Sequence, residues 1–113
     1  MALKSIYAQL SCSDIERSKD WYRILFDREP DANPMDGLLE WHHEKSAGFQ
    51  LFANPDDAGR GSMTVIVSGL AAERERLLKA GHQPSEIGTG DIASICQLSD
   101  PDGNMVVLAE PSE

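Results

Sequence analysis

The amino-acid sequence predicts an α+β fold built from two similar modules, each with a strand, an amphipathic helix and then further strands. The 113 residues are enough for one domain with one hydrophobic core. In each half the apolar residues change from alternation, which is typical of strands, to helical spacing and back. A polar segment with proline and glycine at 54–61 separates the halves. We therefore expect one domain at 1–113, with modules at about 1–57 and 58–113.

The first half contains three predicted strands and one predicted helix. Alternating apolar residues predict a strand over 5–12. A helix is expected over about 14–26, where Ser13 and Glu16 have the spacing of a capping box, in which each side chain satisfies a free backbone N–H. The remaining elements expected in this half are a loop and two strands, at 30–34, 37–43 and 48–53.

The second half repeats this plan with little similarity of sequence. A strand is expected over 62–68 and a helix over 70–80, with Ser68 as the N-cap and Gly81 as the stop. The segment 100–103, Asp-Pro-Asp-Gly, predicts a tight turn, because proline sets one backbone angle and glycine permits a positive one. This turn joins the last two expected strands, at 91–98 and 104–110.

Charge and hydropathy limit the classes of partner. Ten Lys and Arg against 19 Asp and Glu give a net charge of −9, which argues against nucleic acid as a partner. No apolar run approaches the ~20 residues that span a bilayer, and the N-terminal residues lack the apolar stretch of a signal peptide. We expect no membrane partner and a cytoplasmic location, where Cys12 and Cys96 are reduced thiols in or near the core.

Two motifs resemble those of the vicinal-oxygen-chelate superfamily. Residues 13–23, Ser-Asp-Ile-Glu-Arg-Ser-Lys-Asp-Trp-Tyr-Arg, resemble its opening helix, and residues 100–104, Asp-Pro-Asp-Gly-Asn, resemble its final turn. Phe26 and Asp27 stand where that superfamily usually has Leu and Gly. Its members include glyoxalase I, extradiol dioxygenases, fosfomycin-resistance enzymes, methylmalonyl-CoA epimerase and bleomycin-binding proteins. The resemblance implies paired βαβββ modules that form a cup-shaped mixed sheet, and chains that pair as homodimers.

The resemblance also implies where catalytic members hold a divalent metal, on the first and last strands of each module. Here those positions hold Tyr7, Ser62 and Val107, with Leu51 or Gln50 as the fourth. Divalent ions prefer carboxylate, imidazole or thiolate ligands, and none of these side chains provides one. We predict no metal and no cofactor at these positions.

Other candidate chemistry is sparse along the sequence. Glu40, His42 and Glu44 alternate along one predicted strand, but alternate residues lie ~6.6 Å apart, so we expect an exposed polar face rather than three converging metal ligands. His82 follows the second helix and is expected to be an exposed loop residue. The chain has no Gly-x-Ser-x-Gly nucleophile motif, and the segment 87–90 is interpreted as a glycine-containing bend rather than a phosphate loop.

The remaining candidate site is the lining of the predicted cup. The side chains expected there are apolar, aromatic or neutral hydrogen-bonding groups, which is typical of a pocket for an uncharged or planar organic ligand. The predicted ligand-binding residues are Tyr7, Gln9, Trp41, Gln50, Ser62, Thr64, Met105 and Val107. The alternative is that these side chains, above all Val107, simply fill the cup.

Three functional hypotheses follow from this combination of motifs and replaced ligand positions. The leading one is a metal-independent protein that binds or sequesters a small organic molecule in the cup. The alternative is an enzyme of the same superfamily, a lyase, isomerase or dioxygenase with an atypical site and Tyr7 as acid or base. The third is bleomycin-type drug sequestration, which a charge of −9 would suit because that drug is cationic. In each case the expected partners are a small-molecule ligand and a second copy of the chain.

Overall fold

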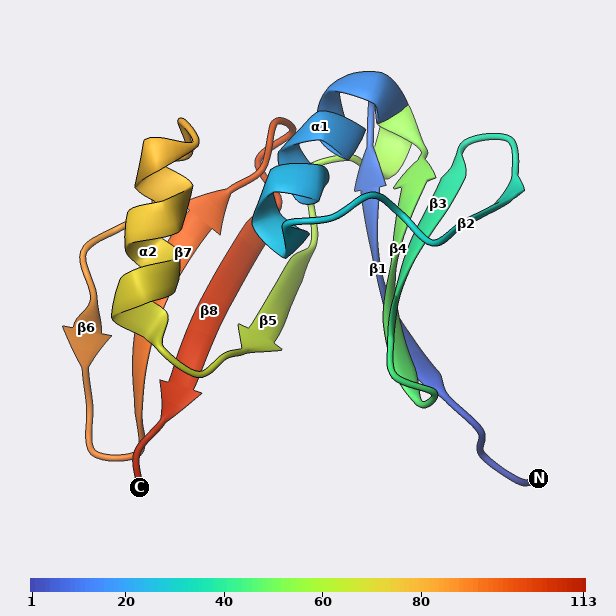
Figure 1. Cartoon of the computed structure of the whole chain (residues 1–113). Coiled ribbons are helices and arrows are strands. Elements are labelled where there is room, and N and C mark those ends of the chain that lie inside the picture. Colours follow the sequence, from blue (N-terminus) through green and yellow to red (C-terminus); the bar gives the residue numbers. More distant parts are fainter.

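The computed structural model describes residues 1–113 and contains two four-stranded sheets and two α-helices (Figure 1). The first module consists of β1 (Ile6–Cys12), α1 (Ile15–Phe26), β2 (Ala32–Met35), β3 (Leu38–His43) and β4 (Ala47–Ala53). A short 3-10 turn, η1 (Pro55–Asp57), leads to β5 (Ser62–Ile66), α2 (Leu70–Lys79), β6 (Gly88–Thr89), β7 (Ala93–Ser99) and β8 (Met105–Pro111). The predicted α+β class with two βαβββ modules is confirmed. Neither helix has the length and apolar character needed to cross a bilayer.

The two sheets have the same strand order, β1-β4-β3-β2 in the first sheet and β5-β8-β7-β6 in the second. In each sheet the first strand of the module pairs in parallel with the last, and the other pairs are antiparallel. Parallel pairing needs a long crossover, which the helix and the two intervening strands supply. No hydrogen-bonded ladder joins β1 to β5, and Figure 1 shows the two sheets diverging below α1.

The helices cover one face of each sheet, and the two covered faces share one hydrophobic core. Its buried side chains are Leu10, Cys12, Trp41, Phe49 and Leu51 from the first sheet, Met63, Cys96, Leu98, Val106 and Leu108 from the second, and Tyr22, Leu25, Leu70 and Leu77 from the helices. Because both covered faces belong to this core, the opposite faces point away from it. These open faces carry Tyr7, Gln9, Glu40, His42 and Gln50 in the first sheet and Ser62, Thr64, Ile66, Ile95, Gln97, Met105 and Val107 in the second.

The start of α1 differs from the predicted capping box by one residue. Asp14 is the N-cap, and its carboxylate accepts a hydrogen bond from the Arg17 backbone N–H at 3.2 Å. Ser13 instead donates its hydroxyl and its backbone N–H to the Asp102 carboxylate. The predicted Ser13 cap is therefore wrong, because a residue far away in the sequence binds this side chain and no local pattern reveals it.

The predicted Ser68 cap of α2 is also wrong. Gly69 is the N-cap, with a φ of +71°, and it offers no side chain. The Glu110 carboxylate, at the end of β8, accepts hydrogen bonds from the Gly69 and Leu70 N–H groups at 2.7 and 3.1 Å. These bonds stabilise a negative charge at the positive end of the helix dipole, and they lower the pKa of Glu110. Gly81, with a φ of +97°, ends the helix as expected.

The structure contains two short strands, β2 and β6, that the sequence does not predict. β2 occupies most of the segment 30–34, where a loop is expected, and it pairs with β3 through Ala32↔Glu40 and Met35↔Leu38 with an irregular register between them. Two prolines and the lack of apolar alternation hide it, although an edge strand tolerates proline. β6 has two residues, too few to produce a periodic pattern.

A buried polar network joins α1 to the turn between β7 and β8; we call it the junction network. The Tyr22 hydroxyl donates to Asp100 Oδ2 at 2.7 Å, and Asn104 Nδ2 donates to the same oxygen at 2.8 Å. Asn104 Nδ2 also donates to the Ser11 carbonyl at 2.8 Å, while its Oδ1 accepts from the Gly61 N–H at 3.0 Å. The network therefore ties the two modules together through residues of both sequence motifs.

His82 is buried rather than exposed, which corrects the expectation of a loop residue in water. Its ring stacks on Trp21 with 4.6 Å between ring centroids, and its Nε2 lies 3.0 Å from the Trp21 carbonyl oxygen. The side chain fills the contact between the end of α2 and α1. Burial lowers the pKa of His82 below its ordinary value.

Both cysteines are free and buried in the core, as predicted. Burial raises the pKa of the Cys12 thiol to about 11 and also raises that of Cys96. Both side chains therefore act as small apolar groups rather than as thiolates.

Candidate functional site

A continuous chain of hydrogen bonds crosses the open face of the first sheet. The sheet register places Gln9 opposite Gln50 and Gln50 opposite Glu40. Gln9 Nε2 donates to Gln50 Oε1 at 2.9 Å, and Gln50 Nε2 donates to Glu40 Oε2 at 2.7 Å. His42 Nε2 lies 2.9 Å from the other Glu40 oxygen. Side chains from three strands are thus ordered before any ligand arrives.

Glu40 is the charged centre of this chain. Its side chain is 15% exposed, and both carboxylate oxygens are hydrogen-bonded. The hydrogen bond from Gln50, followed by that from His42, holds the pKa of Glu40 below its ordinary value. The open face therefore presents one ionised carboxylate near neutral pH, surrounded by amide, imidazole and phenol groups.

His42 is held in place from both its backbone and its ring. Its N–H donates to Asp31 Oδ2 at 2.6 Å, and its carbonyl accepts from the Arg28 guanidinium. The Tyr7 ring meets the imidazole edge to face, with 5.9 Å between centroids and 86° between the planes. Since Glu40 binds Nε2, the imidazole keeps Nδ1 available to exchange a proton or a hydrogen bond with a ligand.

Gly48 lets the Tyr7 ring lie against the sheet. A Cβ atom added at Gly48 would stand 2.5 Å from Tyr7 Cε2 and 2.9 Å from the Trp41 carbonyl oxygen. The Trp41 carbonyl cannot move away easily, because it belongs to the backbone of β3. The missing side chain of Gly48 therefore leaves the space in which the Tyr7 ring lies.

The open face of the second sheet differs from that of the first, because none of its residues is charged. Its hydrogen-bonding side chains are Ser62, Thr64 and Gln97. Ile66 and Met105, which are 64% and 41% exposed, give it apolar surface in contact with water. One open face therefore offers an ordered polar chain, and the other offers apolar surface with neutral polar groups.

All the predicted ligand-binding residues except Trp41 lie on the open faces. Trp41 lies on the covered face, 2% exposed, and its indole N–H donates to the Arg28 carbonyl at 3.0 Å. We expected Trp41 to share a face with Gln50. The register of β3 with β4 instead places Glu40 on that face. Leu51 is also buried in the core, so Gln50 is the residue of β4 that occupies the expected position.

The open faces do not fit the divalent metal that the motif resemblance implies. Tyr7, Gln50 and Ser62 supply neutral oxygen or amide groups, and Val107 supplies none. The Glu40 carboxylate is already bonded through both oxygens. No group of three His, Cys, Asp or Glu side chains in the chain is placed to share one metal ion.

Sequence reasoning missed the pairing of Glu40 with His42. Their backbone positions are ~6.6 Å apart along the strand, but the two side chains lean together and bond at 2.9 Å. Glu44 does not join them, because it lies in the β3–β4 turn with a φ of +52°. The alternation of Glu40 and His42 could have predicted that the two side chains share a face. The register that places Gln50 beside Glu40 could not be predicted from the sequence.

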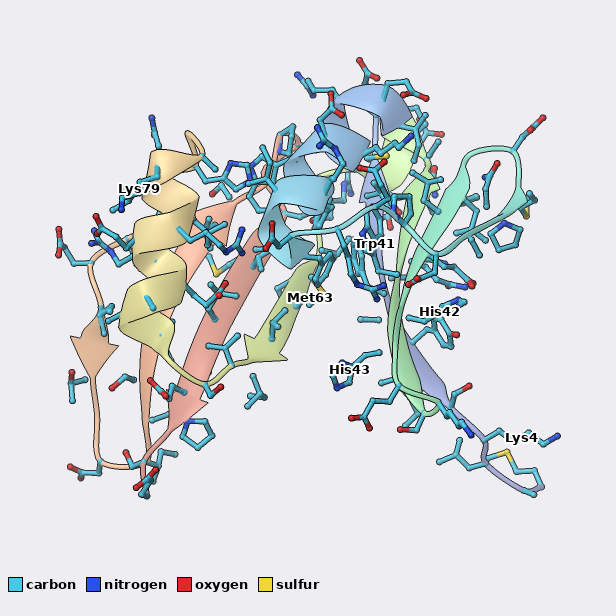
Figure 2. The ribbon with its side chains drawn as sticks, viewed as in Figure 1. Lys4, Trp41, His42, His43, Met63 and Lys79 are labelled. Atoms are coloured by element: carbon cyan, nitrogen blue, oxygen red, sulfur yellow. The ribbon has the colours of Figure 1, made fainter.

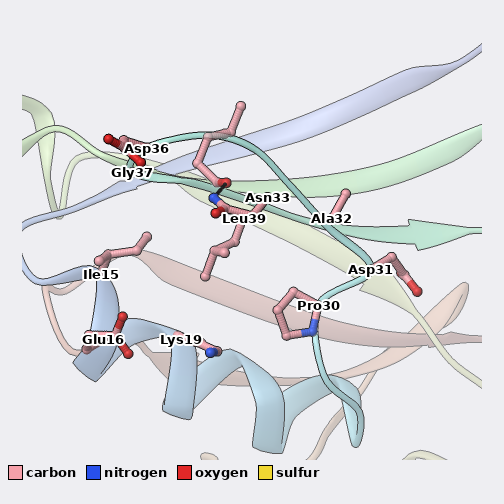
Figure 3. A pocket seen from close by; sticks show the side chains of 11 residues that line it. Ile15, Glu16, Lys19, Pro30, Asp31, Ala32, Asn33, Asp36, Gly37 and Leu39 are labelled. Carbon is pink, nitrogen blue, oxygen red and sulfur yellow. Dashed lines mark hydrogen bonds between the residues drawn. The ribbon is translucent and has the colours of Figure 1, made fainter.

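Two main clefts open on the chain, and neither reaches Gln9, Gln50 or Val107. One, of about 480 Å³, lies between α1 and the β2–β3 hairpin, with Glu16, Lys19 and Asp36 around its opening (Figure 3). The other, of about 460 Å³, lies between the covered face of the first sheet and β5; its lining includes Trp41, His43 and Met63 (Figure 2). A single chain therefore does not close its two open faces into a cup.

Comparison with known proteins places this architecture among solved structures. No protein-family model matches the sequence, and no curated protein sequence matches it either. A glyoxalase/bleomycin resistance protein from Catenulispora acidiphila has a TM-score of 0.86 at 24% identity, covering 94% of this chain and 96% of that chain. An antibiotic binding protein from Streptomyces sp. CB03234 has a TM-score of 0.83 at 22% identity, covering 96% and 95%.

A bleomycin-binding protein, solved in complex with bleomycin, has a TM-score of 0.74 at 18% identity, covering 96% of this chain and 98% of that chain. Identities at this level show similarity of fold and leave the ligand to be argued from the site itself. The paired modules, the strand order and these structural likenesses agree with the motif resemblance. The chain has the fold shared by glyoxalase and bleomycin resistance proteins.

Proposed function

We propose that this protein binds a small organic molecule, without a metal, on the open face of the first sheet. The observation that carries the proposal is the ordered chain from Gln9 through Gln50 and Glu40 to His42. A buried structural network would be covered by other elements, but this one is partly exposed and lies outside the core. Preordered polar groups beside aromatic rings are what a ligand site needs, because ordering them during binding would weaken affinity.

The chemistry of this face favours a planar ligand that is uncharged or cationic. The Tyr7 and His42 rings offer surfaces for stacking, and the Gln9 and Gln50 amides offer both donors and acceptors. The single charge belongs to Glu40, and the whole chain carries −9. Long-range attraction therefore favours cations over anions at this face.

A second copy of the chain supplies the other wall of the proposed site. The open face of one copy's first sheet carries the polar chain, while that of the partner's second sheet carries exposed Ile66 and Met105. Placing these two faces together would enclose the ligand and remove apolar surface from water. The similar bleomycin-binding protein gives a precedent for drug binding by a protein of this fold.

The homodimer is tested first, because the enclosed site depends on it. Light scattering on a size-exclusion column is expected to give the mass of two chains. Met105→Glu, which places a charge on the open face, is expected to shift the protein towards one chain. Ile92→Glu is the matched control, since Ile92 is 85% exposed just before β7. Dimers unaffected by Met105→Glu would contradict this assembly.

Ligand binding is tested by calorimetry with bleomycin as the cationic probe and flavone as the uncharged planar probe. At least one is expected to release heat at micromolar protein, and Tyr7→Ala is expected to weaken that binding about tenfold through loss of ring contact. Leu3→Ala is the matched control, because Leu3 is 67% exposed and precedes β1, outside the open face and both clefts. Equal affinity in Tyr7→Ala and the parent would exclude the open face as the site.

Catalysis is the second candidate function, and the Glu40–His42 pair favours it. A histidine held by a carboxylate is suited to moving a proton on a bound substrate. Lactoylglutathione is the first compound to assay, because a lactoylglutathione lyase from Agrobacterium tumefaciens has the same fold, with a TM-score of 0.76 at 15% identity. Turnover that is lost in His42→Gln would support this candidate. Its absence in the parent protein would leave binding as the function.

A further inference from the structure

The cleft between the two sheets is a second candidate site; Gln9, Gln50 and Glu40 do not line it, and His42 is the one member of the open-face chain that does. Its volume is about 460 Å³, within the range of pockets that hold small organic ligands, ~300–1,000 Å³. One wall is the covered face of the first sheet beyond the end of α1, and the other is β5 (Figures 1 and 2). The cleft therefore lies within one chain, whereas the proposed open-face site needs two.

Aromatic rings and small residues shape the first wall. Trp41 packs between Phe26 and Phe49, with 5.6 and 6.0 Å between ring centroids. Ala8 and Ala47, on the neighbouring strands, leave free space beside these rings. The opposing wall, on β5, presents Met63 and its neighbours. A flat hydrophobic molecule fits between such walls better than a bulky or highly hydrated one.

The polar groups of the cleft distinguish it from the rest of the surface. The chain has 19 Asp and Glu, yet none of them lines this cleft. Arg28 and His43 are present in the lining. Arg28 uses NH1 and NH2 to bind Asp31 and the His42 carbonyl, which leaves its Nε–H uncommitted. The exposed His43 side chain makes no hydrogen bond within the chain, and in Figure 2 it lies near the open end of the cleft.

The geometry points to a binding site in this cleft for a planar aromatic carboxylate. The half-buried Phe26 ring and the exposed Ile66 side chain would contact the flat apolar part of the ligand. Arg28 and His43 would bind its carboxylate, since no Asp or Glu lines the cleft and the Arg28 Nε–H stays uncommitted while NH1 binds Asp31. The preference is therefore opposite in sign to that of the open face, where Glu40 favours cations.

The test uses naphthalene-carboxylate as the probe and naphthalene-carboxamide as its uncharged counterpart. Binding is followed by NMR at the two tryptophan indole N–H groups. The Trp41 signal is expected to shift on titration, and the Trp21 signal, whose ring stacks on His82, is expected to stay in place. The carboxylate is expected to bind at least about threefold more tightly than the amide, as for one exposed charged contact.

Two adjacent residues of β1 provide a matched pair of variants. Ala8→Ile fills the cleft and is expected to weaken naphthalene-carboxylate binding at least about tenfold. Gln9→Ile introduces the same side chain on the opposite face of β1 and is expected to leave this binding within about twofold. Both positions are exposed, so neither change disturbs the core. His43→Glu is expected to remove the preference for the carboxylate.

Three results would overturn the assignment. One is equal affinity for the carboxylate and the amide, and another is unchanged binding in Ala8→Ile. The third is a change of oligomeric state on addition of naphthalene-carboxylate, which would show that a second copy of the chain occupies the cleft. The open-face proposal fails on a different result, namely unchanged affinity of Tyr7→Ala for bleomycin and flavone.

Discussion

The junction network and the open face of the first sheet are both polar, but they differ in burial and in purpose. Tyr22 and Asn104 are fully buried and Asp100 is 5% exposed, and no buried side-chain polar atom in the chain lacks a partner. On the open face, Gln9 is exposed and Tyr7 is 36% exposed. A closed network of this kind stabilises one arrangement of the modules. An exposed network of ordered groups leaves hydrogen-bonding capacity for a ligand.

The largest expected effect is at the centre of the junction network. Asn104→Ala leaves the Gly61 N–H and the Ser11 carbonyl without their hydrogen-bond partner. It also removes one buried donor to the Asp100 carboxylate. We expect a loss of about 3–5 kcal/mol in the free energy of unfolding, measured by urea denaturation. The control is Asn33→Ala in the exposed edge strand β2, expected to cost about 1 kcal/mol or less. Equal costs would remove the distinction between the two regions.

Tyr22→Phe gives a smaller change at the same place. Burial, followed by the hydrogen bond to Asp100, raises the pKa of Tyr22 well above its ordinary value, so the phenol remains a donor at all pH values of interest. Losing this donor to a buried carboxylate is expected to cost about 1–3 kcal/mol in urea denaturation. Tyr7→Phe, at a hydroxyl with no partner within the chain, is expected to change stability by about 0.5 kcal/mol or less. A larger loss of stability in Tyr7→Phe than in Tyr22→Phe would contradict the structural role of the junction network.

Buried His82 is expected to make the free energy of unfolding depend on pH. Burial lowers the pKa of folded His82 below the ordinary ~6.5 of the unfolded chain. As the pH falls through that ordinary value, the unfolded chain gains a proton more readily, so the stability that neutral His82 contributes above it is lost. Unfolding free energies at several values between about pH 7 and pH 5 are expected to fall more steeply in the parent than in His82→Phe, which keeps the stacking on Trp21. Parallel slopes would show that His82 is accessible to protons.

The smallest effect on stability is expected at the open face itself. Gln50→Leu removes the hydrogen bond that contributes most to the lowered pKa of Glu40, so that pKa is expected to rise towards its ordinary value in an NMR titration of the carboxyl carbon. Ionised Glu40 stabilises the fold above about pH 4.3, and this contribution, which is lost as the pH falls through the lowered folded pKa, is smaller in the variant. We expect a cost of at most about 1 kcal/mol at neutral pH. A cost as large as that of Asn104→Ala would mean that this chain is structural.

The sequence predicted the architecture better than the site, for reasons that particular residues illustrate. Helix boundaries and the tight turn are local, so residues 14–26 and 100–103 predicted them closely. Counting from Asp14 also placed Tyr7 and Gln9 on the correct face, because alternation along one strand is fixed. Trp41 was misplaced because the facing of β3 depends on its register with β4, which no motif encodes.

Contacts between distant segments explain the other errors. The sequence suggested Ser13 and Ser68 as caps by local rules, but Asp102 engages the first side chain and Glu110 replaces the second. His82 was predicted to be exposed to solvent, because its stacking partner, Trp21, belongs to the other helix. Each of these depends on tertiary packing that a single sequence does not reveal.

The spatial separation between the junction network and the open faces has an evolutionary consequence. Substitutions at Gln9, Glu40 or Gln50 change the groups that the proposed site offers to a ligand without touching Tyr22 or Asn104. New ligand preferences are therefore accessible by single steps that leave the fold intact, because each site substitution costs a small part of the total stability. A lineage using this scaffold can diversify its ligands while its backbone stays nearly constant.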